Sequence, residues 1–180
     1  YAERVYGIVN PRIGILSIGE EEGKGNQLVR ETYPLLKEAA ELAGLNFTGN
    51  IEGKDIPTGA TDVVVCDGYT GNVVLKLSEG LARMIRDMIR DAAYSGTRAK
   101  IGGALLKPAL EQQFAAIDWR ETGGSLLMGL KGVALIGHGR SDARAIRSAV
   151  RTARQIAAAQ PAEVIAESMA KLGSLAKVEG

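Results

Sequence analysis

The sequence is poor in the residues that stabilise secreted, metal-binding and base-stacking proteins. It has one cysteine, so no disulfide can form within the chain, which suits a reducing compartment. Aromatic residues make up 4% of the chain, too few for modules that stack nucleic-acid bases. No set of histidine, cysteine or carboxylate residues has metal-ligand spacing. We therefore expect no metal, no cofactor and no nucleic-acid partner.

Long apolar runs are also missing. No segment approaches the ~20 apolar residues of a membrane span, and no signal-peptide pattern opens the chain. These absences predict a cytoplasmic protein. Residues 1–7 resemble the last turns of a helix that ends at a glycine, and the first residue is not methionine. We expect the later part of a longer polypeptide.

What is present predicts an α/β protein. Apolar residues make up 46% of the 180 residues and charged residues 24%, as in globular proteins. Apolar runs at 13–18, 45–49, 63–66 and 133–136 alternate with helical patterns at 27–43, 73–94, 143–159 and 161–173. This order predicts a three-layer sandwich with a mostly parallel sheet. We expect one α/β unit over residues 1–180, with a protruding helical segment at 95–120 interrupted at Gly102, Gly103 and Pro108.

Three of the predicted strands end in a polar, glycine-containing loop that opens a helix, at 19–26, 67–72 and 137–142. A shorter loop at 50–53 follows the strand at 45–49. Ligands of parallel sheets bind where strands end, so the loops predict a catalytic edge. The first loop has one residue too few for a P-loop and lacks the third glycine of a dinucleotide fingerprint. It is either a structural turn or an anion site formed by Lys24 and nearby backbone N–H groups.

The other loops allow two interpretations each. In 67–72, Thr70 or Asn72 could cap the following helix, or the cluster of polar groups could bind substrate. His138, the only histidine, lies between two glycines at a strand end, which would allow a ligand to approach closely. Cys66 ends an apolar strand, where we expect a small buried side chain rather than a nucleophile.

Basic residues concentrate in the middle of the chain. Residues 1–80 carry 7 basic and 12 acidic side chains, whereas residues 81–160 carry 13 and 6. Five arginines from Arg140 to Arg154 recur at helical spacing, as do three from Arg83 to Arg90. Such stripes are either solvated surface or docking sites for an acidic protein. At 98–110, apolar residues with a basic fringe fit either a membrane surface or a subunit interface.

Four segments together resemble one family: 16–26 (LSIGEEEGKGN), 49–53 (GNIEG), 65–72 (VCDGYTGN) and 132–139 (GVALIGHG). They resemble the PlsX family, the phosphate acyltransferases of bacterial phospholipid synthesis, over about residues 1–155. The resemblance implies a homodimer with a fold like isopropylmalate dehydrogenases and phosphate acetyltransferases. It also implies a reaction in which inorganic phosphate attacks the thioester of acyl-acyl carrier protein. Family members carry a further N-terminal half that this chain lacks.

On this resemblance we base a hypothesis for the site. Lys24 and the backbone of residues 23–26 would hold phosphate, Asn72 with Thr70 or His138 would polarise the thioester carbonyl, and Asp67 would orient Lys24 or Asn72. The catalytic candidates are therefore Lys24, Asp67, Asn72 and His138. The other substrate-binding candidates are Gly23, Gly25, Asn26, Asn50, Glu52, Gly68, Thr70, Gly71 and Gly139. For docking of the acidic carrier protein we expect Arg144, Arg147 and Arg151.

Two alternatives remain open. The chain could belong to a phosphate acetyltransferase-type enzyme that uses an acyl-coenzyme A. It could instead be a catalytically silent fragment that binds the carrier protein or the membrane. The segment at 98–110 would provide peripheral membrane contact in the first hypothesis and in the fragment alternative.

Overall fold

The computed structural model describes residues 1–115 and 118–175 of the chain. This part of the chain packs as two compact units. The first, here the sheet unit, comprises Tyr1–Cys66, Leu126–Ala134 and the described part of Ala153–Gly180. The second, the hairpin unit, comprises Asp67–Ser125 and Leu135–Thr152. The single unit predicted over residues 1–180, with its protruding segment at 95–120, stays a prediction.

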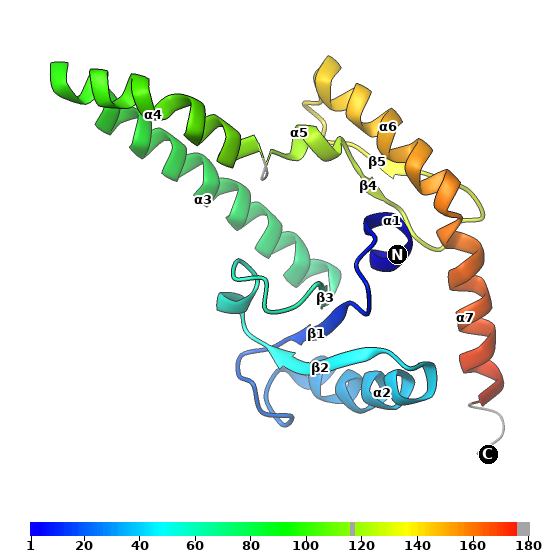
Figure 1. Ribbon diagram of the computed structural model, residues 1–180. Helices are drawn as coiled ribbons and strands as arrows, with labels where there is room; N and C mark the ends of the chain where they lie inside the picture. Colours follow the sequence, from blue (N-terminus) through cyan, green and yellow to red (C-terminus); the bar gives the residue numbers. More distant parts are fainter. Residues whose placement is uncertain (116–117, 176–180) are drawn as a thin grey trace. The chain divides into compact units, whose positions relative to one another are not determined.

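A parallel sheet organises the sheet unit (Figure 1). Its central strand β1 (Arg12–Leu16) pairs in parallel with β2 (Asn46–Ile51) on one side and β3 (Val63–Val65) on the other. Helix α2 (Gln27–Ala43) packs against β1 and β2. This arrangement confirms the predicted α/β class with a mostly parallel sheet and is consistent with a three-layer sandwich. β3 is one residue shorter than expected. Cys66 follows its end and is exposed, so its predicted burial is wrong.

The centre of the sheet is tightly packed. Ile15 of β1 is 2% exposed. Next to it, a Cβ atom on Gly14 would lie 2.6 Å from Ile51 Cγ2 and 2.9 Å from Thr61 Cγ2. Real Cβ atoms do not approach other atoms so closely, so any side chain at position 14 would push β2 and the segment before β3 away.

Capping residues determine where the first two helices of the sheet unit begin or end. Helix α1 (Ala2–Tyr6) ends at Gly7, which has a left-handed backbone with φ of 69°, as predicted. Helix α2 starts after Asn26, whose side-chain oxygen accepts a hydrogen bond from Val29 N at 2.9 Å. It continues through Pro34 and ends at Gly44. The 3₁₀ turn η1 (Gly53–Asp55) follows β2, and α7 (Pro161–Leu175) packs against α2.

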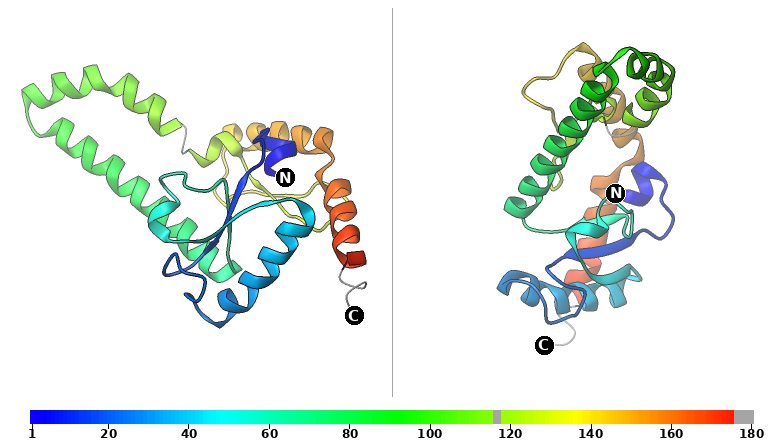
Figure 2. Two further views of the ribbon diagram at one scale, coloured as in Figure 1. Left: turned by 60° about the horizontal axis from the view of Figure 1, so that its bottom comes forward. Right: turned by 90° about the vertical axis from the view of Figure 1, so that its left-hand side faces the viewer.

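Two long helices make up the largest part of the hairpin unit. Helices α3 (Gly68–Tyr94) and α4 (Thr97–Ala115) lie side by side, as both views in Figure 2 show. The predicted interruption of α4 is wrong, because the helix continues through Gly102, Gly103 and Pro108. Close packing explains the glycine at 103, since a Cβ atom there would lie 2.7 Å from Ala93 Cβ. Tertiary contact with α3 thus outweighs the poor helix propensity of glycine.

The start of α3 also differs from the prediction. Residues 68–72 are its first turns rather than a loop, and Asp67 is its N-cap. The Asp67 carboxylate accepts hydrogen bonds from Thr70 N at 2.8 Å and from Thr70 Oγ1 at 2.6 Å. The cap is therefore Asp67, whereas the sequence suggested Thr70 or Asn72.

The rest of the hairpin unit is built around the first half of α6 (Ala143–Ala159), a helix with the predicted bounds. A short helix, α5 (Trp119–Thr122), ends at Gly123 with φ of 79°. A Cβ atom on Gly123 would lie 2.2 Å from Ala149 N and 2.4 Å from Ala145 O, so only glycine lets α5 pack on α6 so closely. Strands β4 (Ser125–Leu126) and β5 (Leu135–Ile136) pair with each other. Arg140 precedes α6 and is not part of its arginine stripe, contrary to the prediction.

Within the described residues, no helix combines the length and apolarity needed to cross a bilayer.

The first prediction concerns the ion pair between Arg12 and Asp62, which ties β1 to the segment before β3. Arg12 Nε lies 3.0 Å from Asp62 Oδ2, Arg12 N donates to the same oxygen at 2.8 Å, and Arg12 Nη2 donates to Oδ1 at 3.1 Å. The hydrogen bonds from the Arg12 side chain lower the pKa of Asp62 to about 2. Because the pKa is lower than in the unfolded chain, the pair stabilises the fold at neutral pH. This stabilisation is lost as the pH falls from ~4 towards the folded-state value.

We therefore expect Asp62→Asn to lower the thermal unfolding midpoint at pH 7 and to approach the wild-type midpoint in acid. Asp87→Asn, which removes an aspartate that has no ion pair within residues 1–115 and 118–175, is the matched control. A midpoint of Asp62→Asn that differs from the wild type by the same amount at every pH would contradict this account.

Candidate functional site

The ends of the three parallel strands lie at one edge of the sheet. The chain leaves β1 at Leu16, β2 at Ile51 and β3 at Val65, and these residues stand at matched ends of the ladders. The segments that follow are the glycine-rich loop, the 3₁₀ turn and the start of α3. The loop with His138 differs, because β5 pairs with β4 and not with this sheet. Within the described residues, three of the four predicted strands therefore belong to this sheet.

The glycine-rich loop, residues 17–26, is held by its backbone. Asn50, which is 7% exposed, donates from Nδ2 to Glu21 O at 2.6 Å, and Lys24 N donates to the same carbonyl at 3.0 Å. Gly25 closes the loop with φ of 109°, and a Cβ atom there would lie 2.7 Å from Val29 Cγ1. A side chain at Gly25 would thus be strained by both its backbone and its neighbours.

The three glutamates of this loop would repel an anion if they all faced it, and two of them are directed elsewhere. Glu22 accepts hydrogen bonds from Tyr33 and Lys37 of α2, each at 3.1 Å, and the bond from Lys37 is the main cause of its lowered pKa. Glu20 pairs with Lys54 at 3.4 Å. Both carboxylates are therefore balanced by lysines outside the loop.

Lys24 differs from these lysines. Its stem packs over Gly19, where a Cβ atom would lie 3.0 Å from Lys24 Cγ. The side chain is exposed, and in the described part of the chain no carboxylate forms an ion pair with its ammonium group. Lys54, by contrast, is held by Glu52 at 3.0 Å as well as by Glu20. Lys24 is thus available to balance an anion at this edge.

Two buried polar atoms beneath the loop have no hydrogen-bond partner in the described structure. They are Asn50 Oδ1 and Ser17 Oγ. Ser17 Oγ lies 3.0 Å from the position of a Cβ atom on Gly25, so it is directly under the closing turn. Buried polar atoms of this kind usually find a partner, and they mark a polar place for a ligand or water.

At the start of α3, Asp67 is fully engaged as a cap. Its pKa is lowered, chiefly by the hydrogen bond from the Thr70 hydroxyl. Thr70 Oγ1 donates its only proton to that carboxylate. Asn72 lies exposed on the following turn, and Gly68 has open space where a side chain would be. The Asp67 carboxylate supplies the negative charge that the dipole of this helix start favours.

His138 is held in the hairpin unit by contacts on three sides. Its ring centroid lies 4.9 Å from that of Trp119, and its Nε2 lies 4.0 Å from Glu79 Oε2. Nδ1 accepts from Arg140 N at 3.4 Å. Since Nδ1 is an acceptor, the neutral ring carries its proton on Nε2, the nitrogen that faces Glu79.

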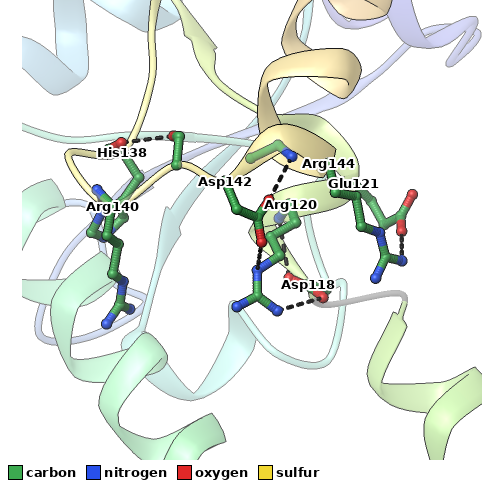
Figure 3. Close-up of polar contacts among 9 residues, drawn as sticks. Asp118, Arg120, Glu121, His138, Arg140, Asp142 and Arg144 are labelled. Atoms are coloured by element: carbon green, nitrogen blue, oxygen red, sulfur yellow. Dashed lines mark hydrogen bonds and ion pairs between the residues drawn. The ribbon is translucent and has the colours of Figure 1, made fainter.

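A network of charges lies beside this histidine (Figure 3). Asp142 caps α6 by accepting from Ala145 N at 2.9 Å, which is the main cause of its lowered pKa. Arg120 lies between two carboxylates, with Nε 3.2 Å from Asp142 Oδ2 and Nη1 3.9 Å from Asp118 Oδ2. The first contact is close enough for an ion pair, although its angle falls short of a hydrogen bond.

Of the three arginines predicted to dock the carrier protein, two have partners within the hairpin unit. Arg144 forms an ion pair with Glu121 (Figure 3), and Arg151 Nη2 donates to Glu121 O at 2.9 Å. Arg147 is exposed and has no ion pair in the described residues. Arg144 and Arg151 therefore fix α5 on α6, whereas Arg147, like Arg154, has no ion pair in the described residues.

The predicted site residues thus fall into two groups. In the sheet unit the loop, the end of β2 and the turn after it bring together Gly23, Lys24, Gly25, Asn26, Asn50 and Glu52. In the hairpin unit the start of α3 carries Asp67, Gly68, Thr70, Gly71 and Asn72, while the loop after β5 carries His138 and Gly139. That the two groups share one site stays a prediction.

Sequence reasoning missed the surroundings of His138. Glu79, Trp119, Arg120 and Asp142 come from three separate segments, and their meeting depends on tertiary packing. Trp119 offered one signal, since it is the only tryptophan of the chain. No group of three or more metal-ligating side chains gathers in the described parts of either unit.

Comparison with known proteins places this chain in a family. The sequence profile of the family described as "Fatty acid synthesis protein" matches residues 1–164. The phosphate acyltransferase of Halothermothrix orenii is 47% identical over 155 residues, which cover 86% of this chain and 46% of that protein. That of Aquifex aeolicus is 54% identical over 153 residues, 85% of this chain and 44% of that protein.

A third phosphate acyltransferase, from Alkaliphilus oremlandii, is 45% identical over 173 residues, 96% of this chain and 50% of that protein. The chain therefore spans about half the length of the curated relatives it matches. With matches over most of its own length, it belongs to the fatty acid synthesis protein family, the PlsX family indicated by its motifs.

Proposed function

We propose that the protein containing this chain transfers an acyl group from acyl-acyl carrier protein to inorganic phosphate. A phosphate oxygen attacks the carbonyl carbon of the thioester, the C–S bond breaks, and the thiolate leaves and takes up a proton. The products are an acyl phosphate, a precursor for phospholipid synthesis, and free carrier protein. The names of the relatives support phosphate acyl transfer in general. The observation that carries the proposal is Lys24, which has no ion pair in the described residues, in a loop where two of the three glutamates pair with lysines of other segments.

Phosphate is an anion at neutral pH and needs positioning more than activation by a base. Lys24 and the backbone N–H groups of residues 23–26 supply a charge and several donors at one edge of the sheet. Glu20 and Glu22, turned towards Lys54 and Lys37, leave this charge in place. Asn26 takes part through its backbone, because its side-chain oxygen caps α2.

The thioester carbonyl needs donors for the negative charge that develops on its oxygen. Thr70 is a poor candidate, because its hydroxyl proton is donated to Asp67. Asn72 at the start of α3 and the Nε2–H of His138 remain. Each such donor stabilises the transition state by roughly 3–4 kcal/mol. Asp67 then acts by holding the first turn of α3, and its orientation of Lys24 or Asn72 stays a hypothesis.

The test is release of free thiol from acyl-acyl carrier protein by the complete protein, with and without phosphate. We expect Lys24→Ala to lower kcat/KM for phosphate by about 100-fold or more, the loss seen when an oxyanion partner is removed. Lys131→Ala is the control, because Lys131 is an exposed lysine outside the proposed site and has no ion pair in the described residues. A Lys24→Ala enzyme within about threefold of the wild type would overturn the assignment.

The same assay separates the alternatives. An enzyme of the phosphate acetyltransferase type would turn over acetyl-coenzyme A, which a carrier-dependent enzyme should barely use. A catalytically silent fragment would bind acyl-acyl carrier protein without releasing thiol, whether or not phosphate is present.

Docking of the acidic carrier protein is proposed to depend on Arg147, which is exposed and has no ion pair in the described residues. We expect Arg147→Glu to weaken carrier-protein binding about tenfold and to reduce its dependence on salt, because one attractive charge becomes repulsive. The control is Arg98→Glu on α4, which makes the same change of charge elsewhere. Binding measured by calorimetry at two salt concentrations checks this, and equal weakening by both variants would return Arg147 to a solvated surface role.

We also propose a cytoplasmic homodimer that touches the membrane surface through residues 98–110. This part of α4 exposes Ile101 (61%), Leu105 (80%) and Leu106 (53%) beside Arg98, Lys100 and Lys107. We expect Leu105→Asp with Leu106→Asp to abolish flotation with anionic liposomes, whereas Gln112→Asp should not. If the double variant is instead monomeric by light scattering and still floats with the liposomes, the segment is a subunit interface.

A further inference from the structure

A cavity of about 300 Å³ lies within the hairpin unit, next to the residues that hold His138. It is bordered by one face of α3, by α5 with the residue before it, and by the loop after β5. A cavity of this size is at the lower end of those that bind small ligands. The residues that line it are Glu79, Ala82, Arg83, Arg86, Asp118, Trp119, Arg120 and Arg140.

The lining is strongly positive, with four arginines against two carboxylates. The two carboxylates are already balanced by other groups. Asp118 lies against Arg120, and Glu79 pairs with Lys76 at 3.5 Å. Within the described residues, the other three arginines, Arg83, Arg86 and Arg140, form no ion pair. The cavity therefore holds three guanidinium charges without counter-charges.

Aromatic rings contact three of the four guanidinium groups, those of Arg86, Arg120 and Arg140. The Cζ atoms of Arg140 and Arg120 lie 5.9 Å and 5.5 Å from the centroid of the Trp119 ring. Arg86 lies over Phe114 at 5.0 Å. Cation–π contacts of this kind orient the guanidinium planes without consuming their N–H donors. Several oriented donors are thus left for a ligand.

We propose that this cavity binds a phosphate group. Arginine forks match the tetrahedral oxygens of phosphate with paired hydrogen bonds, and a bound anion would relieve the repulsion between the arginines that line the cavity. None of the residues of this site belongs to the glycine-rich loop, which is proposed to bind the phosphate that reacts. The group could arrive as free inorganic phosphate or as the phosphodiester of the prosthetic arm that carries the acyl thioester.

The experiment measures binding in the complete protein carrying Lys24→Ala, so that phosphate held by the glycine-rich loop does not contribute. The probes are inorganic phosphate, 4′-phosphopantetheine, and pantetheine, which has no phosphate. Binding is followed at constant ionic strength by calorimetry. The emission of Trp119, identified by its loss in Trp119→Phe, reports occupation of the cavity itself.

We expect saturable binding of a phosphate-bearing probe and none of pantetheine. Adding Arg83→Gln and Arg140→Gln should weaken that binding about tenfold or more, whereas Arg90→Gln on the same helix outside the cavity should change it less than about twofold. The single variant Arg83→Gln, an exposed side chain on α3, should shift affinity in the same direction and guards against misfolding of the double variant. Thermal unfolding of each variant confirms its fold.

Tighter binding of phosphopantetheine than of inorganic phosphate would identify the donor arm as the source, and equal affinities would identify free phosphate. Either result supports the site. Equal binding of pantetheine and phosphopantetheine, or unchanged binding in the arginine variants, would overturn it. The readout here is binding, whereas the test of acyl transfer measures thiol release. A result that disproves acyl transfer therefore leaves this site supported, and a result that disproves this site leaves acyl transfer supported.

Discussion

The parallel pairing of β1 with both β2 and β3 is the constraint on which the rest of the sheet unit depends. Parallel strands deliver their following segments to one edge, so the pairing alone brings the glycine-rich loop and the turn after β2 to that edge. Two features maintain it. The Arg12–Asp62 pair closes the opposite end of β1 against the segment before β3, and Gly14 leaves no room for a side chain between the strands.

The charges at this edge are arranged by pairing, and the arrangement determines what can bind. Glu20 and Glu22 lie within an exposed loop, yet each pairs with a lysine from another segment, whereas Lys24 has no ion pair in the described residues. In the hairpin unit Arg120, Arg144 and Arg151 form ion pairs, whereas Arg83, Arg86 and Arg140 form none in the part of the chain that the structure describes. Each proposed anion site is therefore built around cations without an ion pair.

Local signals explain which parts of the fold could be predicted. The predicted bounds of the helices at 27–43 and 143–159 match the structure at both ends. The helical periodicity of the first ends at Gly44, and that of the second begins directly after a polar cap. The start of α3 was missed because Gly68 and Gly71 look like loop residues, whereas the two hydrogen bonds that Thr70 donates to Asp67 cap the segment as a helix. Gly103 suggested a break, but its role is contact with Ala93, which no local pattern reveals. Motifs located Lys24 and His138, while the packing of Trp119 on His138 joins segments far apart in the sequence.

The central claim is that Lys24 and the start of α3 act on the same reacting groups. A crystal structure of the complete protein with phosphate and a thioether analogue of the acyl donor tests it most directly. The account predicts phosphate against Lys24 Nζ and the backbone of residues 23–26, with the carbonyl mimic facing Asn72 or His138. A phosphate bound away from Lys24, or a carbonyl mimic out of reach of both donors, would contradict it.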